Sequence, residues 1–460
     1  MSVTQSVIDF IRTLPGDAIP AQAREMGRRA LLDTVGVTLA GVDEPSARAV
    51  RDVLAAEGAS GRATLLGTAQ RSSLAGAALA NGTAGHALDF DDVTAHMSGH
   101  PSIPLAPALL VVAEDTGASG ADLVGAFVVG FEVECKIGRG MGRSHYARGF
   151  HQTTTLGALG SAAACARLLG LSRDETAHAL GIASSMAGGL RANFGSMTKP
   201  LQAGNAARAG VVAALLARRG FTGGDDILDG PFGFVRAFSP ADDGDLEQIG
   251  GFGDPWEVVD PGISVKKYPC CFVSHRAADA TLSLVRRHGI TPEQVERVEV
   301  HLPGGQVSPT GGVGPMIHPR PKTGLEGKFS MQYVVASAIH DRALRFATFE
   351  DAAVRRPELQ ALLARVHPVN DTARHPAATS DQYCAVDIRL AGGRVVSEAL
   401  VEPRGGPADP LSWEELLEKY RDCAERALPA ERVARSAEML VELDGVRDVR
   451  ELTATLATDA

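Results

Sequence analysis

Residues 81–102 concentrate side chains that can transfer protons or bind a charged ligand. The stretch reads NGTAGHALDFDDVTAHMSGHPS, and alanine-rich, apolar segments flank it on both sides. Burying charged groups is costly unless they are paired or used in chemistry, so titratable groups this dense predict a functional site. The alternative is an acidic loop with helix caps. The titratable residues are His86, Asp89, Asp91, Asp92, His96 and His100.

Further groups of polar residues follow along the chain. In residues 191–199 a loop containing Gly and Ser offers backbone donors and ends in Lys199, which Pro200 follows. A Lys-Pro pair that opens a helix after such a loop is typical of anion binding. The groups are His145, Tyr146 and His151; Arg191, Ser196 and Lys199; Lys266, Lys267 and His275, near Tyr268 and Pro269; and Lys328.

Two kinds of site fit these residues. A Zn, Mn or Fe ion could bind to His86, Asp89, His96 or His100, but their spacing matches no specific metal signature, and nearby lysines would repel a metal. The other is a metal-free anion pocket, in which lysines and imidazoles bind a substrate with several carboxylates. Removing a proton next to a carboxylate creates an anion that clustered cationic donors can stabilise. We expect the anion pocket, with Lys199, Lys266 and Lys267 as its cations.

The composition narrows the class of protein. The chain has 460 residues, of which 45% are hydrophobic but only 5% aromatic, and its 51 glycines suit closely packed helices. The net charge of −10 argues against general nucleic-acid binding. No apolar run reaches the roughly 18–20 residues of a membrane span, and the N-terminus lacks a signal-peptide pattern. Six scattered cysteines without a C-x-x-C pair indicate a reducing compartment, so we expect a cytoplasmic protein.

Hydrophobic periodicity predicts a mainly α fold. We expect helices at about 72–87, 104–116, 119–138, 151–169, 173–187 and 198–219, with a capping box at Ser172 and Glu175. Alternating segments predict a strand at Val295–Val300 and a hairpin around Ala391-Gly392-Gly393, with one helix at about 327–341 between them. We therefore expect a large helical domain from 1–265 and 403–460, and a smaller inserted α+β domain at 266–402.

Five blocks of the chain together resemble the MmgE/PrpD family. They are NGTAGHALDFDDVTAHMSGHPS, GFHQTTTLGALGSAAA, SMTKPLQAGNAARAG, KKYPCCFVSH and KFSMQY, in that order. The family includes methylcitrate dehydratases, cis-aconitate decarboxylases and iminodisuccinate epimerases. The resemblance implies a helical domain built from both chain ends, an inserted α+β domain, a homodimer, and an active site between the domains that needs neither metal nor cofactor.

The resemblance also assigns site residues and shows two departures. In the decarboxylase branch a Thr stands where this chain has Val93, and a His where it has Cys271; both lower the expectation of decarboxylation. The residues on the family's active-site positions are Asp89, His100, His151, Lys199 and Lys266.

Our hypothesis is a metal-independent lyase that acts on a small di- or tricarboxylate, like a 2-methylcitrate dehydratase, through an α-carbanion. An epimerase or a cis-aconitate-type decarboxylase in the same pocket is the alternative, and a non-catalytic carboxylate-binding protein is the alternative of another class. A metal-dependent hydrolase ranks last. The expected roles are His151 or His100 as base, Lys199 and Lys266 as carboxylate ligands that stabilise the anion, Asp89 as the residue that orients an imidazole, Tyr146 as acid, and Lys267, His275, Arg191 and Ser196 as further substrate ligands.

Overall fold

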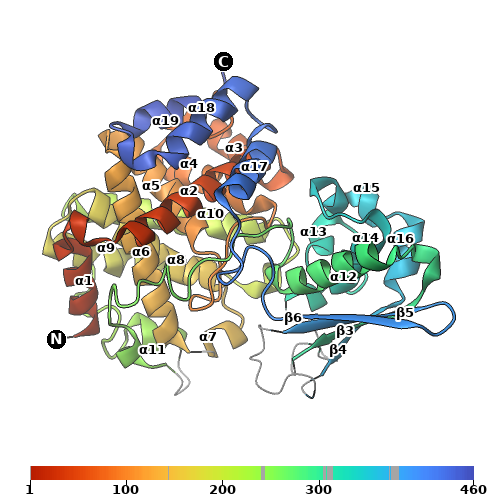
Figure 1. The fold of residues 1–460 in the computed structure, drawn as a ribbon. Helices are drawn as coiled ribbons and strands as arrows, with labels where there is room; N and C mark the ends of the chain where they lie inside the picture. The colour runs from red at the N-terminus through yellow and green to blue at the C-terminus, as the bar shows by residue number, and fades with distance from the viewer. Residues whose placement is uncertain are drawn as a thin grey trace. The chain divides into compact units, whose positions relative to one another are not determined.

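The computed structural model describes residues 2–142, 144–239, 244–303, 307, 314–371, 373 and 383–459. The chain divides into two compact units: Met1–Asn193, Met197–Val265 and Ser412–Ala460 form the first, and Phe194–Ser196 and Lys266–Leu411 form the second. The first is almost entirely helical, and the second combines helices with a sheet (Figure 1). The expectation of a mainly α fold with a smaller α+β part is confirmed.

The helices of the first unit begin and end close to the expected residues. Ser172 forms the expected capping box with Glu175 at the start of α9. The long helices are α1 (Val3–Thr13), α2 (Ala21–Gly41), α3 (Pro45–Ala56), α4 (Leu74–Ala87), α5 (Ser102–Thr116), α6 (Gly120–Met141), α8 (Gln152–Leu168), α9 (Arg173–Met186), α10 (Thr198–Ala217), α17 (Trp413–Ala424) and α18 (Ala430–Val441). Shorter pieces are β1 (Ala63–Thr64), β2 (Arg71–Ser72), α7 (Ser144–Ala147), α11 (Phe234–Phe238) and α19 (Val449–Thr455).

Small residues let the central helices approach closely. Helix α10 packs against α4, α8 and α9. A Cβ added to Gly82 of α4 would lie 2.7 Å from the Cα of Gly204 of α10, and one added to Gly204 would lie 2.3 Å from the carbonyl oxygen of Leu79. Glycine therefore allows the two backbones to come into contact, which explains how a chain with few aromatic residues fills its core.

The C-terminal helices return to the first unit. Helix α17 packs against α2, and Tyr420 of α17 lies against Gly36 of α2, where an added Cβ would be 3.0 Å from the Tyr420 ring. Figure 1 shows the blue α17 beside the red α2. The tail is thus part of the same core as the N-terminal helices.

The second unit is a four-stranded sheet with the order β4-β3-β5-β6, in which only the β3–β4 pair is parallel. Helices α12 and α14 pack against the sheet. The strands are β3 (Val295–Leu302), β4 (Val366–Asn370), β5 (Cys384–Leu390) and β6 (Val395–Leu400). The helices are α12 (His275–His288), α13 (Gly324–Gly327), α14 (Met331–Asp341), α15 (Asp351–Val354) and α16 (Pro357–Leu363).

Two details of this unit differ from the expectation. The single helix expected at 327–341 is wrong: α13 ends at Gly327, and α14 begins at Met331 because the hydroxyl of Ser330 accepts a hydrogen bond from the backbone N–H of Tyr333 as an N-cap. Strand β4 was not expected. It contains Pro368, which an edge strand tolerates because one side of its backbone makes no ladder hydrogen bonds.

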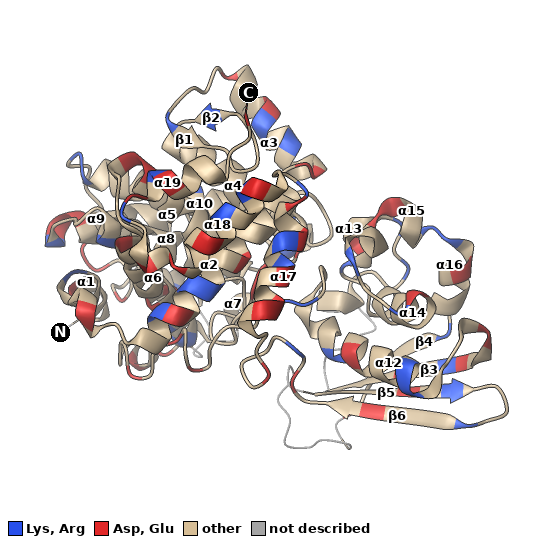
Figure 2. Ribbon diagram, turned by 45° about the horizontal axis from the view of Figure 1, so that its top comes forward, with Lys and Arg blue, Asp and Glu red and all other residues tan. Residues whose placement is uncertain are grey.

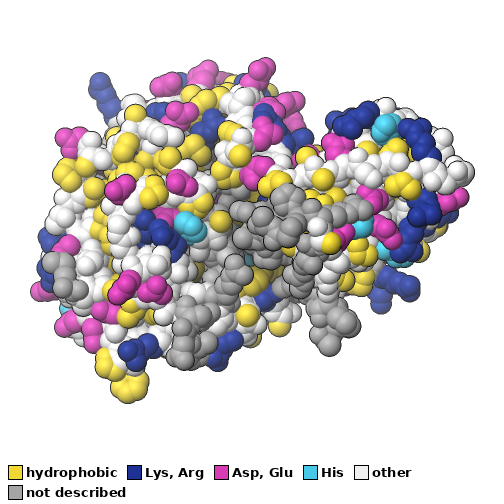
Figure 3. All heavy atoms as spheres, turned by 60° about the horizontal axis from the view of Figure 1, so that its bottom comes forward, with side chains coloured by type: hydrophobic (Ala, Val, Ile, Leu, Met, Phe, Trp, Pro, Cys, Tyr) yellow, Lys and Arg dark blue, Asp and Glu magenta, His cyan; other side chains and the backbone are white. Residues whose placement is uncertain are grey.

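Charged side chains are mixed on the surface. In Figure 2 both signs of charge lie along the outer helices α17 and α18. On the face drawn in Figure 3, basic and acidic side chains are interspersed among the described residues. Such mixing avoids a large field of one sign on that face. Among the described residues, no helix combines the length and apolar character needed to cross a bilayer.

We predict that Gly204→Ala lowers the free energy of unfolding by about 1–3 kcal/mol, because the new methyl group would collide with the backbone of α4. Urea unfolding followed by circular dichroism measures the change. Gly445→Ala is the matched control, since an added Cβ there meets nothing within 4 Å. Equal stability of the two variants would contradict the close α4–α10 contact.

Candidate active site

The loop between α4 and α5 carries the carboxylates of the site. Its first turn places Asp89 at a φ of 52°, a left-handed conformation that costs a non-glycine residue about 1–2 kcal/mol. Contacts along the loop hold this backbone. The side chain of Asp89 binds Lys199, and Asp92 accepts hydrogen bonds from the backbone N–H and the hydroxyl of Ser102 at the start of α5. Asp91 between them is fully buried.

Lys199 of α10 lies between a carboxylate and an imidazole. Its Nζ is 2.5 Å from Oδ1 of Asp89 and 2.7 Å from Nε2 of His86, and the side chain is only 4% exposed. An ammonium group can only donate, so Nε2 of His86 accepts and its proton is on Nδ1. That proton is donated to Asp91, whose oxygens lie 2.8 and 3.0 Å away. Burial lowers the pKa of His86 and keeps this imidazole neutral.

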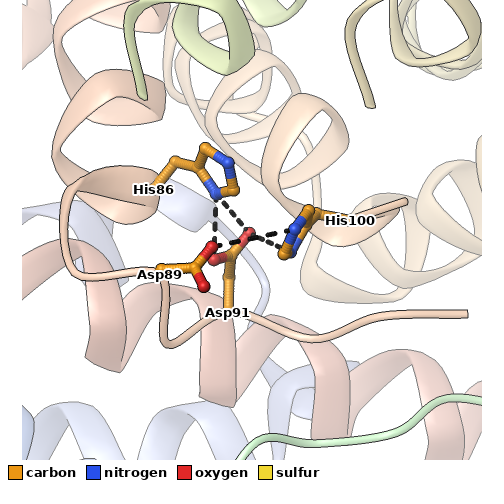
Figure 4. Close-up of side chains that lie close together, drawn as sticks. All are labelled: His86, Asp89, Asp91 and His100. Carbon is orange, nitrogen blue, oxygen red and sulfur yellow. Dashed lines mark hydrogen bonds and ion pairs between the residues drawn. The ribbon is translucent and has the colours of Figure 1, made fainter. Parts of the chain in front are cut away.

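Asp91 orients a second imidazole as well. Nδ1 of His100 is 3.2 Å from Oδ2 of Asp91 and 3.0 Å from the carbonyl oxygen of Asp92, so it carries the proton and leaves Nε2 as the basic nitrogen. Figure 4 shows both imidazoles directed at the same carboxylate. Burial alone would raise the pKa of Asp91, but His86 and His100 outweigh it and hold that pKa well below its usual range. Asp91 thus orients two imidazoles, while Asp89, whose Oδ1 lies 3.9 Å from Nε2 of His100, keeps its expected orienting role as a prediction.

His151, which precedes α8, completes a group of three imidazoles. Its ring centroid is 5.9 Å from that of His86 and 6.5 Å from that of His100. The side-chain amide of Gln202 donates to the carbonyl oxygen of Leu190, so its oxygen faces Nδ1 of His151 at 2.7 Å. His151 therefore also has its proton on Nδ1 and its basic nitrogen at Nε2. Burial, with Lys199 nearby, lowers its pKa well below the usual value, so the ring is neutral near pH 7.

The carboxylates and imidazoles of this site meet the distance requirement of a metal site. One ligand atom from each of four residues lies within 4.8 Å of the others: His86, Asp89, Asp91 and His100. The ammonium of Lys199, however, already contacts Asp89 and Nε2 of His86, which are two of these four residues. Asp91 is engaged by two imidazole N–H groups. The arrangement therefore fits a lysine cation better than a metal ion.

Two carboxyl groups behind the loop are not available as bases. Burial raises the pKa of Asp92 to about 8, despite the hydrogen bonds from Ser102. Glu134 of α6 is completely buried, and its carboxyl group has no hydrogen-bond partner among the described residues. Burial, with Asp92 nearby, raises the pKa of Glu134 well above its usual value. Asp92, with a pKa of about 8, is therefore mainly protonated at pH 7, and burial favours the protonated form of Glu134 as well.

Other predicted residues of the first unit lie in separate contacts. His96, one of the alternative ligands of the metal interpretation, pairs with Glu257 at 2.6 Å and is not part of the group of His86, Asp89, Asp91 and His100. His145 is buried between the carbonyl of Phe238 and the hydroxyl of Thr155, which is a structural role. The guanidinium of Arg191 stacks 3.6 Å over the ring of Tyr146, and its Nη1 donates to the Tyr146 carbonyl. Arg191 and Tyr146 therefore form a stacked, hydrogen-bonded pair. Their expected roles stay predictions.

The remaining predicted residues belong to the second unit. Lys266 and His275 are completely buried, and the His275 ring packs edge-on against Tyr268 at 5.2 Å. Lys267 is 42% exposed and lies 3.4 Å from Asp279. Ser196 is assigned to this unit too. Their roles as substrate ligands stay predictions. Lys328 ends α13 and donates to the carbonyl of Pro269, so it does not open a helix as expected.

The comparisons with known proteins identify the family. The family models for the MmgE/PrpD N-terminal domain and the MmgE/PrpD C-terminal domain match residues 5–247 and 268–444. The chain is therefore built as a two-domain protein of this class. It belongs to the MmgE/PrpD family.

Two cis-aconitate decarboxylases align over nearly the whole chain, and a 2-methylcitrate dehydratase aligns over part of it. A cis-aconitate decarboxylase from Mus musculus is 31% identical over 99% of this chain and 93% of its own length. One from Homo sapiens is 29% identical over 99% of this chain and 94% of its own length. A 2-methylcitrate dehydratase from Cupriavidus necator is 27% identical over 62% of this chain and 60% of its own length. These relatives are lyases, and a lyase-type activity is supported for this chain.

We predict that Glu134→Gln stabilises the protein at pH 8. The pKa of Glu134 is higher in the folded state than its unfolded value of about 4.5. The stability that the bound proton provides is therefore complete below the unfolded pKa and is lost as the pH rises through the folded pKa. The slope is about 1.4 kcal/mol per pH unit while only the folded state remains protonated. Chemical unfolding from pH 5 to 8 should show that the free energy of unfolding of the variant rises relative to that of the wild type. The exposed Glu418→Gln on α17 is the control, and parallel curves for Glu134→Gln and wild type would contradict the prediction.

Proposed function

We propose that this protein is a lyase that acts on a small tricarboxylate through a carbanion next to a carboxylate. The observation that carries the proposal is the group of three imidazoles with protons held on Nδ1 and lone pairs on Nε2, beside the ammonium of Lys199. The Nε2 atom of a neutral imidazole is a base, and a buried ammonium attracts the carboxylate of a substrate. The site thus offers proton transfer and anion stabilisation in one place.

The proton-transfer roles follow from the geometry. His151 or His100 removes or returns a proton at carbon through Nε2, while Asp91 and Gln202 fix the opposite ring nitrogens. Lys199 stabilises the negative charge that develops on the substrate carboxylate when the carbanion forms. Asp89 forms an ion pair with Lys199 at 2.5 Å and so holds its Nζ in place before the substrate binds. Each role uses an atom whose protonation state the neighbouring contacts define.

Decarboxylation of a cis-aconitate-like acid is the reaction we favour. The relatives that align over nearly the whole chain are named for it. In this reaction the bond to the departing carboxylate breaks, CO2 leaves, and the electron pair on carbon takes a proton that Nε2 of a histidine has first taken up from water. Dehydration, which the sequence alone favoured, is the second candidate, because Val93 and Cys271 depart from the decarboxylase pattern. There the imidazole first removes a proton and a hydroxyl group then leaves as water.

We predict turnover of at least one tricarboxylate, detected by proton NMR in deuterated buffer with cis-aconitate, citrate, 2-methylcitrate and iminodisuccinate. Release of CO2 indicates decarboxylation, loss of water indicates dehydration, and deuterium uptake without a new product indicates epimerisation. Lys199→Met should lower kcat at least a hundredfold, because the developing anion loses its cation. Arg208→Met, exposed on the same helix, is the matched control.

Two results would contradict this proposal. Tight binding of these acids without any turnover would support a carboxylate-binding protein instead. Loss of activity on thorough chelation, restored by a divalent metal, would show that the site works through a metal ion. Chelated protein should therefore be measured beside the untreated sample.

For a reaction in which His151 removes a proton, as in dehydration, we predict that Gln202→Glu moves the acidic limb of the pH–rate profile to higher pH. A carboxylate 2.7 Å from Nδ1 favours the imidazolium form, so it raises the pKa of His151 and leaves less neutral base at a given pH. The measurement is kcat against pH for wild type and variant. An unchanged profile in an active variant would exclude His151 as the base and leave His100.

A further inference from the structure

We infer that Lys419, in the C-terminal helix α17, is a positioning residue for the loop that carries Asp89 and Asp91. As a statement about catalysis the inference rests on the proposed function. The Nζ atom of Lys419 donates to the carbonyl oxygen of Phe90 at 3.0 Å and lies 3.8 Å from the centre of the Phe90 ring. Phe90 is the residue between the two carboxylates. Lys419 thus holds the main chain at the point where both originate.

A second carboxylate fixes the lysine from the opposite side. Oδ1 of Asp33 in α2 lies 2.7 Å from Nζ of Lys419, and the two side chains are 1% and 7% exposed. A buried ion pair is weak evidence for stability, because well-packed apolar residues often replace one without loss. The hydrogen bond from Lys419 to the Phe90 carbonyl supplies a different reason for a buried charge at this position. The pair gives one backbone carbonyl a charged donor in a fixed position.

The loop needs such a contact because its backbone is strained. Asp89 has a positive φ, and strained residues persist when the surrounding structure over-determines them. Rotation of the Phe90 peptide would move Asp91 away from Nδ1 of His86 and His100, and Asp89 away from Lys199. Each residue from Asp89 to Asp92 makes a hydrogen bond that fixes its position, and Lys419 is the donor to Phe90. By fixing the Phe90 carbonyl, Lys419 of the C-terminal segment therefore helps to keep Asp91 where it accepts the Nδ1 protons of His86 and His100.

The test replaces both charges, Asp33→Leu with Lys419→Met, so that no buried charge is left alone. The proton positions of His86 and His100 are read from nitrogen NMR of protein with 15N-labelled histidine, which needs no substrate. We expect the Nδ1–H signals of these two rings to weaken or exchange faster, and their apparent pKa values to change. With a substrate, we expect kcat to fall at least tenfold with KM changed less than threefold, and the pH–rate profile to shift.

Arg421→Met is the matched control, because Arg421 is exposed on the same helix; it should leave the histidine signals and kcat unchanged. Histidine signals and a pH profile like those of the wild type in the double variant would overturn the inference, even if its melting temperature falls. If the double variant does not fold, Lys419→Arg, which keeps the charge near Asp33 but moves the donor, gives the same two readings. If no acid is turned over at all, the proposed function fails, and the NMR measurement still decides the role of Lys419.

Discussion

The contact of the Lys199 ammonium with Asp89 and His86 determines the chemistry of the whole site. Because the lysine can only donate, it assigns the lone pair of His86 to Nε2 and sends the proton to Nδ1. Asp91 accepts that proton and the equivalent one from His100. One buried cation thus defines the proton positions on one imidazole directly, and a shared carboxylate extends the arrangement to the next.

Burial then decides which acids and bases are usable near pH 7. The same desolvation that lowers the pKa of His86 and His151 raises that of Asp92 and Glu134. The pKa of Asp91 is lowered instead, because two imidazole donors stabilise its charge. The site therefore contains an ionised carboxylate, Asp91, that two imidazoles contact, and carboxyl groups, Asp92 and Glu134, whose side chains no imidazole contacts among the described residues. Groups pushed apart in this way are what proton-transfer chemistry requires.

Much of the fold was predictable because its signals are local. The capping box at Ser172 and the alternation at Val295–Val300 each depend on residues a few positions apart. The strand at Val366–Asn370 was not predictable, since Pro368 is tolerated there only because of the strand's place at the sheet edge. The helix at 327–341 was misjudged because Ser330 acts as a cap, although serine also occurs inside helices.

The site shows the same division between local and distant information. The density of acids and histidines in 81–102 marked the loop, but no local pattern separates Asp91, which holds two imidazoles, from Asp92, which holds Ser102. Gln202 was missed, although its place three residues after Lys199 on one helix face was a usable signal. Lys419 is separated from Phe90 by most of the chain, and its sequence context is that of an ordinary charged helix. Only the return of the C-terminal helices to α2 brings that charge to the loop, so the tail of the chain is part of what keeps the carboxylates in place.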